Sequence, residues 1–273
     1  MNKRIGPYVI EEIAPGVWAI DDDADESIYL VCGEKKAFVI DTGSADAPLM
    51  SVIRSLWEAE VELLLTHAHF DHMYHSDEFS SVSLLEAEAA AWKKTLAPIV
   101  WISSLASGKK PKRYGVSAWR ALRDGDVLPL GGKSLRVIAA PGHTPGSLIL
   151  ADEEDRLLFT GDAFGSGSFA WMWMPGCLCL SAYRESLRTL LVKLEPYRDW
   201  RMLGGHRRQG LQTEADPHAK ALSYQTLADM ETLCGKILSG ELAPEGQERN
   251  FGVKNYLYRY GDAAIVLTKG KIH

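Results

Sequence analysis

Four side chains of the kinds that bind metals fall within one heptapeptide, Thr66-His67-Ala68-His69-Phe70-Asp71-His72. The heptapeptide follows Val61-Glu62-Leu63-Leu64-Leu65, a short apolar run that predicts a buried strand. We therefore expect the histidines in a loop at a strand end, where open α/β sheets place their chemistry. Imidazole and carboxylate suit zinc, iron or manganese, and alternation along an extended segment directs the first two histidines to one side. The motif predicts a loop that serves two adjacent metals, and solvated histidines on a polar loop are the simpler alternative.

Length and composition predict one globular domain over residues 1–273, because 46% of the residues are hydrophobic and 24% are charged. The sequence has no apolar signal core near Met1 and no run of eighteen apolar residues, so we expect a cytoplasmic protein without a membrane partner. Four cysteines are too few for a disulfide framework in such a chain, which favours free thiols. The net charge of −6 argues against a long nucleic-acid partner.

Short apolar runs separated by turn residues predict many strands. They lie at 17–20, 27–32 and 37–40 before the motif, and at 126–130, 135–139, 148–150 and 157–159 after it. Helical spacing of apolar residues predicts helices over 47–60 and 182–194. Residues 78–96 are expected to be mostly helical, with a short strand at 80–83 as the alternative. From about residue 211, a helix over 219–238 and a hairpin over 257–267 are predicted as an extension of the same domain.

Further polar residues also follow predicted strands. His143 lies in Pro-Gly-His-Thr-Pro-Gly-Ser, Asp162 in Thr-Gly-Asp, and His206 in Gly-Gly-His. Asp41 ends another strand in Asp-Thr-Gly, where it either caps the following helix or orients a metal-binding loop as a hydrogen-bond acceptor. Each of these residues is therefore expected near the edge of a sheet.

With these motifs in this order, residues 17–210 resemble the metallo-β-lactamase superfamily, which includes glyoxalase II and the lactonases. The signature H-x-H-x-D-H stands here as His67, His69, Asp71 and His72. The resemblance implies an α/β fold in which two mixed β-sheets form an αββα sandwich flanked by helices. It implies two divalent cations, zinc being favoured over iron or manganese. On this mapping the first metal binds His67, His69 and His143, the second binds Asp71, His72 and His206, and Asp162 bridges them.

Two segments depart from the common pattern of the family. Many relatives continue the signature with small residues, whereas this chain has Met73-Tyr74-His75, so we expect Tyr74 and His75 near the substrate. His75 would either assist proton transfer or only pack and hydrogen-bond. The segment 164–180 is rich in aromatic residues and methionine and would line an apolar pocket, form a buried plug or make a homodimer contact. Trp171 and Trp173 are its candidate substrate-binding residues.

We expect a hydrolase that attacks a small-molecule thioester, lactone, ester or amide with a metal-bridging hydroxide, since the sequence has no G-x-S-x-G nucleophile motif. Asp71 would orient the hydroxide and transfer its proton to the leaving group. Three alternatives stay open. A phosphodiesterase would need a basic groove, for which the run from Lys109 to Arg113 is the candidate. A persulfide dioxygenase-like oxidoreductase would use one iron, and a binding module would hold metal without turnover.

Overall fold

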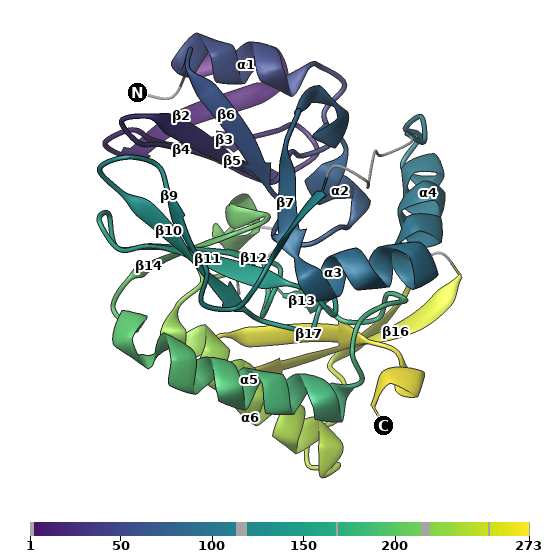
Figure 1. Ribbon diagram of the computed structural model, residues 1–273. Coiled ribbons are helices and arrows are strands. Elements are labelled where there is room, and N and C mark those ends of the chain that lie inside the picture. The colour runs from purple at the N-terminus through teal and green to yellow at the C-terminus, as the bar shows by residue number, and fades with distance from the viewer. Residues whose placement is uncertain (1–2, 113–118, 168, 214–218, 251, 273) are drawn as a thin grey trace.

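Two β-sheets stack face to face in the computed structural model, which describes residues 3–112, 119–167, 169–213, 219–250 and 252–272 (Figure 1). In this part of the chain the first sheet has eight strands in chain order: β1 (Lys3–Ile5), β2 (Tyr8–Ala14), β3 (Val17–Asp21), β4 (Ser27–Cys32), β5 (Lys36–Ile40), β6 (Glu60–Leu64), β7 (Val82–Leu85) and β8 (Trp119–Leu122). The second has the order β14 (Arg201–Gly204), β12 (Leu157–Gly161), β11 (Leu148–Asp152), β10 (Ser134–Ala139) and β9 (Val127–Pro129). Strands β5 and β6, β6 and β7, and β7 and β8 pair in parallel in the first sheet, and β12 and β14 pair in parallel in the second. The other pairs of these two sheets are antiparallel, so both sheets are mixed.

The central core forms where the inner faces of the two sheets meet. Period-2 alternation determines which side chains enter it: in β4, Tyr29 and Val31 face the second sheet, whereas Ile28 and Leu30 face away from it. From the second sheet, Leu150 and Phe159 are completely buried in the same cluster. Removal of these apolar side chains from water, at about 25 cal/mol per Å² of buried surface, stabilises the stacking of the sheets.

Helices cover the outer faces of both sheets. Helix α1 (Leu49–Leu56) buries Leu49, Val52 and Ile53 against the first sheet. Helices α5 (Leu180–Leu194) and α6 (Tyr224–Leu238) pack together against the second, with the apolar residues of α5 at helical spacing on one face. The expected αββα sandwich with mixed sheets is confirmed. The other helical segments in the described part of the chain are α2 (Phe70–Met73), η1 (Ser76–Glu78), α3 (Glu86–Ala91), η2 (Trp92–Leu96), α4 (Ala97–Ala106), η4 (Glu195–Tyr197), η5 (Arg207–Gly210) and η6 (Lys269–Lys271).

A third, smaller sheet joins the middle of the chain to its C-terminal part. Its order is β13 (Ala170–Trp171), β17 (Ala263–Leu267), β16 (Val253–Tyr260) and β15 (Gly246–Asn250). The predicted hairpin over 257–267 is confirmed as β16 and β17, which turn at Gly261. Because β13 pairs in parallel with β17, the segment that follows Asp162 is held against this hairpin.

The structure differs from the sequence predictions in several elements. The strand alternative for residues 80–83 is confirmed as β7, which interrupts the helix expected over 78–96. Helix α6 begins at Tyr224 and not near 219, because Ser223 and Thr226 form a capping box at its N-terminus. Strands β1 and β2 and helix α4 were not predicted. All four cysteines are free thiols.

No helix in the described part of the chain combines the length and apolar character needed to cross a membrane.

Candidate metal centre

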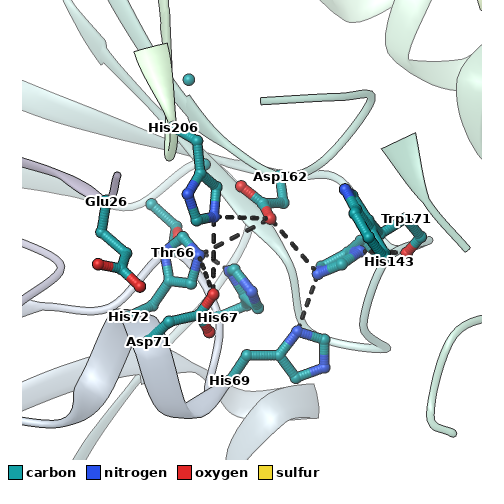
Figure 2. A network of polar contacts seen from close by, with 12 residues as sticks. Glu26, Thr66, His67, His69, Asp71, His72, His143, Asp162, Trp171 and His206 are labelled. Atoms are coloured by element: carbon teal, nitrogen blue, oxygen red, sulfur yellow. Dashed lines mark hydrogen bonds and ion pairs between the residues drawn. The ribbon is translucent and has the colours of Figure 1, made fainter. Parts of the chain in front are cut away.

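The predicted ligands meet at one edge of the stacked sheets, where several strands end (Figure 2). The heptapeptide follows β6 and continues into α2, His143 follows β10, Asp162 follows β12 and His206 follows β14. The side chains form three overlapping groups, and within each group the ligand atoms lie within 4.8 Å of one another. These groups are His67, His69 and His143; His67, His72 and Asp162; and Asp71, His72 and His206.

Asp162 lies between two sets of ligands. The first set is His67, His69 and His143, and the second set is Asp71, His72 and His206. Its Oδ2 is 3.7 Å from the Nε2 atoms of three histidines, His72, His143 and His206. Asp71 approaches only one set, with Oδ2 3.8 Å from Nε2 of His72 and 3.6 Å from Nε2 of His206. In the other set, Nδ1 of His69 and Nε2 of His143 are 2.9 Å apart, close enough for both atoms to contact one cation in place of the hydrogen bond between them.

Hydrogen bonds from outside the centre fix which nitrogen each histidine presents. His143 Nδ1 is 2.9 Å from the carbonyl oxygen of Trp171, and His206 Nδ1 is 3.1 Å from that of Asp25. A carbonyl only accepts, so both Nδ1 atoms carry hydrogen and leave Nε2 as a lone-pair donor to a metal. His72 is fixed likewise, because its Nδ1 is 2.9 Å from the Asp41 carboxylate.

Asp41 also determines the orientation of His67, through Thr66. The Thr66 hydroxyl donates its one hydrogen to Asp41 Oδ2 at 2.7 Å, and the Thr66 backbone N–H donates to Oδ1, also at 2.7 Å. The hydroxyl oxygen, 3.1 Å from His67 Nδ1, must therefore accept from that ring nitrogen. The carboxylate at the end of β5 thus orients two histidines of the motif, one directly and one through Thr66.

The donor atoms fit divalent cations. Nε2 of His67 and Nε2 of His72 are buried and have no hydrogen-bond partner, and Oδ1 of Asp162 is buried and unpaired as well. Buried polar atoms are almost always paired, because leaving one unpaired costs about 1–3 kcal/mol. A cluster of unpaired imidazole and carboxylate atoms is therefore suited to hold metal, and the donor types are ones that zinc accepts.

Electrostatics separate the two sets of histidines. Burial, reinforced by neighbouring imidazoles, lowers the pKa of His67 well below its usual value, and burial lowers the pKa of His69 to about 3. Burial also lowers the pKa of His143. For His72, burial opposes ionisation, but the carboxylates of Asp71, Asp162 and Asp41 outweigh burial and raise the pKa well above its usual value. At neutral pH the imidazoles of the first set are therefore uncharged, with one hydrogen each, whereas the imidazole of His72 carries a second proton when no metal is bound.

Gly205 leaves space for the centre. A Cβ atom at this position would lie 2.5 Å from Oδ1 of Asp162 and 2.5 Å from Cε1 of His72, closer than any side chain could tolerate. Gly205 N–H donates to the carbonyl oxygen of Gly161 at 3.1 Å, and its own carbonyl accepts from Ser27 N–H at 2.7 Å. The absent side chain thus lets the strand end before His206 lie against the ligands.

The family model described as the metallo-beta-lactamase superfamily matches residues 22–206, which include all seven of these residues. The chain belongs to the metallo-β-lactamase superfamily. It is 31% identical over 196 residues to the protein of Homo sapiens named acyl-coenzyme A thioesterase MBLAC2, covering 62% of this chain and 70% of the relative. It is 27% identical to the hydroxyacylglutathione hydrolase GloC of Haemophilus influenzae, covering 61% of this chain and 77% of the relative.

Solved structures agree with this assignment at the level of the fold. A metallo-β-lactamase family protein from Thermus thermophilus superposes with a TM-score of 0.58 and 22% identity, covering 87% of this chain and 85% of that protein. Since the relatives in sequence carry the names of hydrolases, the prediction of a metal-dependent hydrolase is confirmed at the level of this superfamily.

Tyr74 and His75, the residues that depart from the family pattern, lie buried just after α2. His75 Nδ1 is 2.7 Å from the Glu78 carboxylate and its Nε2 is 2.9 Å from the Ala45 carbonyl, so both ring nitrogens have acceptors. The Tyr74 ring packs edge-on to His75 and below the ammonium of Lys112, which is 4.3 Å from the ring centroid. Substrate binding by either residue would require these contacts to rearrange, and it stays a prediction.

The apolar segment 164–180 is divided between the core and the metal centre. Phe164, Met172 and Cys177 are buried in the cluster that also contains α5 and α6. Trp171 is half-buried, and its indole lies beside His143 (Figure 2). Trp173 is 8% exposed, with its ring centroid 6.2 Å from that of Trp171. Trp171 is thus the predicted substrate residue that the structure places at the centre.

Two lysines of the basic run pair with aspartates and are not free to bind an anion. Lys109 pairs with Asp46 at 2.9 Å and Lys112 with Asp77 at 2.8 Å, whereas Arg113 and Tyr114 lie outside the described residues.

Glu26, in the turn before β4, lies beside Asp71 and His72 (Figure 2). Burial and a hydrogen bond to Asp22 raise the pKa of Glu26 well above its usual value. The turn before β4 thus supplies a buried carboxyl group near the metal ligands.

The two sets of ligands should differ in the proton cost of binding zinc. A metal at Nε2 of His72 must displace a proton, whereas the uncharged imidazoles of His67, His69 and His143 each offer a lone pair without losing a proton. We expect zinc affinity of the second set to fall as the pH decreases from about 8 to about 6, with release of about one proton per zinc, and that of the first set to change much less. Calorimetric titration of His143→Ala and His206→Ala proteins in buffers of different ionisation enthalpy isolates each set. Equal proton release by the two variants would contradict this assignment.

Proposed function

We propose that this protein is a dinuclear metallohydrolase that cleaves acyl thioesters, with two zinc ions held by the seven residues of the centre. The observation that carries the proposal is the convergence of His67, His69 and His143 with Asp71, His72 and His206 around Asp162. Two ligand sets that share one carboxylate suit a pair of cations about 3.5–4 Å apart, the usual separation in dinuclear hydrolytic sites.

The names of the relatives support a thioester as the substrate. One relative is named as an acyl-coenzyme A thioesterase and another as a hydroxyacylglutathione hydrolase. In this chain, the half-buried indole of Trp171 offers an apolar surface beside His143, which suits the acyl part of such a substrate. An acyl thioester would thus place its apolar chain against β13 and its carbonyl carbon at the histidines.

The residues of the centre have separate roles in this proposal. When bound, the cations would lower the pKa of water to about 7 and polarise the carbonyl group. Asp71, the least buried of the carboxylates in the centre, would orient the attacking water and carry its proton to the sulfur of the leaving group. Burial opposes ionisation of Asp71, but His72 and His206 lower its pKa, which keeps it a proton acceptor at neutral pH. Water attacks directly, so no covalent enzyme intermediate forms.

The alternatives lack a supporting observation of this kind. A phosphodiesterase would need free cations beside the centre, but the described lysines of the basic run, Lys109 and Lys112, pair with aspartates. A persulfide dioxygenase would use a single iron, which the second set of ligands and the shared Asp162 do not favour.

Zinc-loaded protein should hydrolyse acyl thioesters faster than lactones, β-lactams or phosphodiesters. In Asp71→Asn we expect kcat for the thioester to fall by about 10²–10⁴-fold with a KM within about threefold of wild type, because proton handling is lost while substrate contacts remain. The assay follows release of free thiol, and zinc content is measured on the same samples.

Asp77→Asn is the matched control, since this exposed carboxylate pairs with Lys112 and does not touch the centre. A wild-type protein that holds two zinc ions but prefers phosphodiesters would refute the thioester proposal. An Asp71→Asn protein with unchanged kcat would refute only the role of that residue.

Trp171→Ala should weaken binding of long acyl chains. Loss of the indole surface beside His143 removes roughly 1.4 kcal/mol of apolar contact, which corresponds to about a tenfold higher KM for a long-chain thioester and little change for an acetyl thioester. The backbone carbonyl that accepts from His143 is kept, so zinc content should not change. Trp101→Ala, at a tryptophan 55% exposed on α4, is the control. An unaltered chain-length profile would point to a packing or interface role for the segment.

A further inference from the structure

Glu88 joins two loops of the metal centre that come from different sheets. It is completely buried, in α3, and lies twenty residues after Ala68 of the heptapeptide. Its Oε1 accepts from the backbone N–H of Ala68 at 2.7 Å, and its Oε2 accepts from the backbone N–H of Gly146 at 2.9 Å. Burial raises the pKa of Glu88, and these two N–H groups and the nearby Thr144 side chain partly offset that rise. One side chain thus contacts the residue between His67 and His69 and also the loop that carries His143.

The close packing of α3 indicates that these contacts are a built feature of the fold. A Cβ atom at Gly146 would lie 2.2 Å from the backbone nitrogen of Glu88 and 2.4 Å from its Cβ, so only glycine allows the approach. The loop is further tied internally, since Thr144 N–H donates to the Ser147 hydroxyl at 3.0 Å. Movement of Glu88 would therefore change the spacing between the two loops.

The second set of ligands has separate supports. His72 is held by Asp41, and His206 by the carbonyl of Asp25. The Thr42 N–H also donates to the backbone carbonyl of His72 at 2.9 Å. None of these hydrogen bonds includes Glu88, so a change at Glu88 should act on the first set alone.

We propose that Glu88 is a positioning residue that sets the distance between His67 and His69 on one loop and His143 on the other, and thereby selectively sets the zinc affinity of the first set. The inference rests on the proposed metal centre and is independent of the substrate, because its readout is binding of zinc alone. A carboxylate suits this role because two backbone N–H groups need two acceptor oxygens, whereas an amide offers one acceptor and would turn its NH₂ group toward the other N–H.

The test is Glu88→Gln, placed in two backgrounds that each retain one set of ligands. In His206→Ala, which keeps His67, His69 and His143, we expect Glu88→Gln to raise the zinc dissociation constant by about 10- to 100-fold, the usual effect of losing a hydrogen bond that orients metal ligands. In His143→Ala, which keeps Asp71, His72 and His206, the same change should alter zinc affinity by less than about twofold, since distant independent sites act additively. Affinities are measured by chelator competition.

Glu86→Gln is the matched control, because this exposed carboxylate lies two residues earlier on α3 and pairs with Arg123 at 3.0 Å. If Glu88→Gln fails to fold, Thr144→Val removes the hydroxyl near the Glu88 carboxyl group and should weaken the first set in the same direction. Equal weakening in both backgrounds would mean that Glu88 supports the fold in general and would overturn the proposal, as would unchanged affinity in both. Absence of zinc binding by either parent background would instead refute the proposed metal centre.

Discussion

The stacking of two sheets through a common apolar core is the constraint on which the metal centre depends. Four strands from the two sheets, β6, β10, β12 and β14, end at the same edge, and each is followed by ligands. The side chains that fix the stacking, such as Tyr29 and Phe159 with ring centroids 5.0 Å apart, make no contribution to the chemistry. Tyr29 also donates from its hydroxyl to the Gly204 carbonyl at 2.6 Å, which ties the first sheet to the strand before His206. The distances between ligands are thus set by packing well away from them.

A layer of acceptors behind the ligands converts this placement into metal-binding capacity. Hydrogen bonds from Nδ1 of three histidines, His143, His206 and His72, are accepted by Trp171, Asp25 and Asp41, respectively. The Nε2 atoms of these histidines are thereby directed toward the centre. Two of these acceptors are backbone carbonyls, which depend on the path of the chain and not on the side chain. Asp41 adopts a left-handed backbone conformation, φ +59°, which aspartate tolerates better than most residues. Burial then keeps the imidazoles of the first set uncharged. The orientation and the charge of these side chains therefore suit a cation before one binds.

The sequence predicted the parts of this arrangement that depend on residue type at strand ends. The heptapeptide, His143, Asp162 and His206 each follow an apolar run, and their meeting follows from the sandwich. The acceptor layer was predicted only at Asp41. The roles of Asp25 and Trp171 as acceptors belong to their backbone carbonyls, which no residue pattern encodes. Glu88 lies in an Ala- and Glu-rich stretch that reads as an ordinary helix surface, and only the tertiary contact with Gly146 distinguishes it from the exposed Glu86. The burial of Glu26 was likewise not predicted, because an acidic turn is usually exposed to solvent.

The central claim is that the histidine and aspartate side chains at this edge direct water onto an acyl carbon. Single-turnover cleavage of an acyl thioester by the zinc-loaded protein in oxygen-18 water tests it most directly, with mass spectrometry of the released acid. We expect one labelled oxygen in the carboxylic acid in a single turnover, without uptake of dissolved oxygen, since water supplies the new oxygen atom of the acid. Product acid without label, or turnover that consumes dissolved oxygen with a single iron bound, would contradict it.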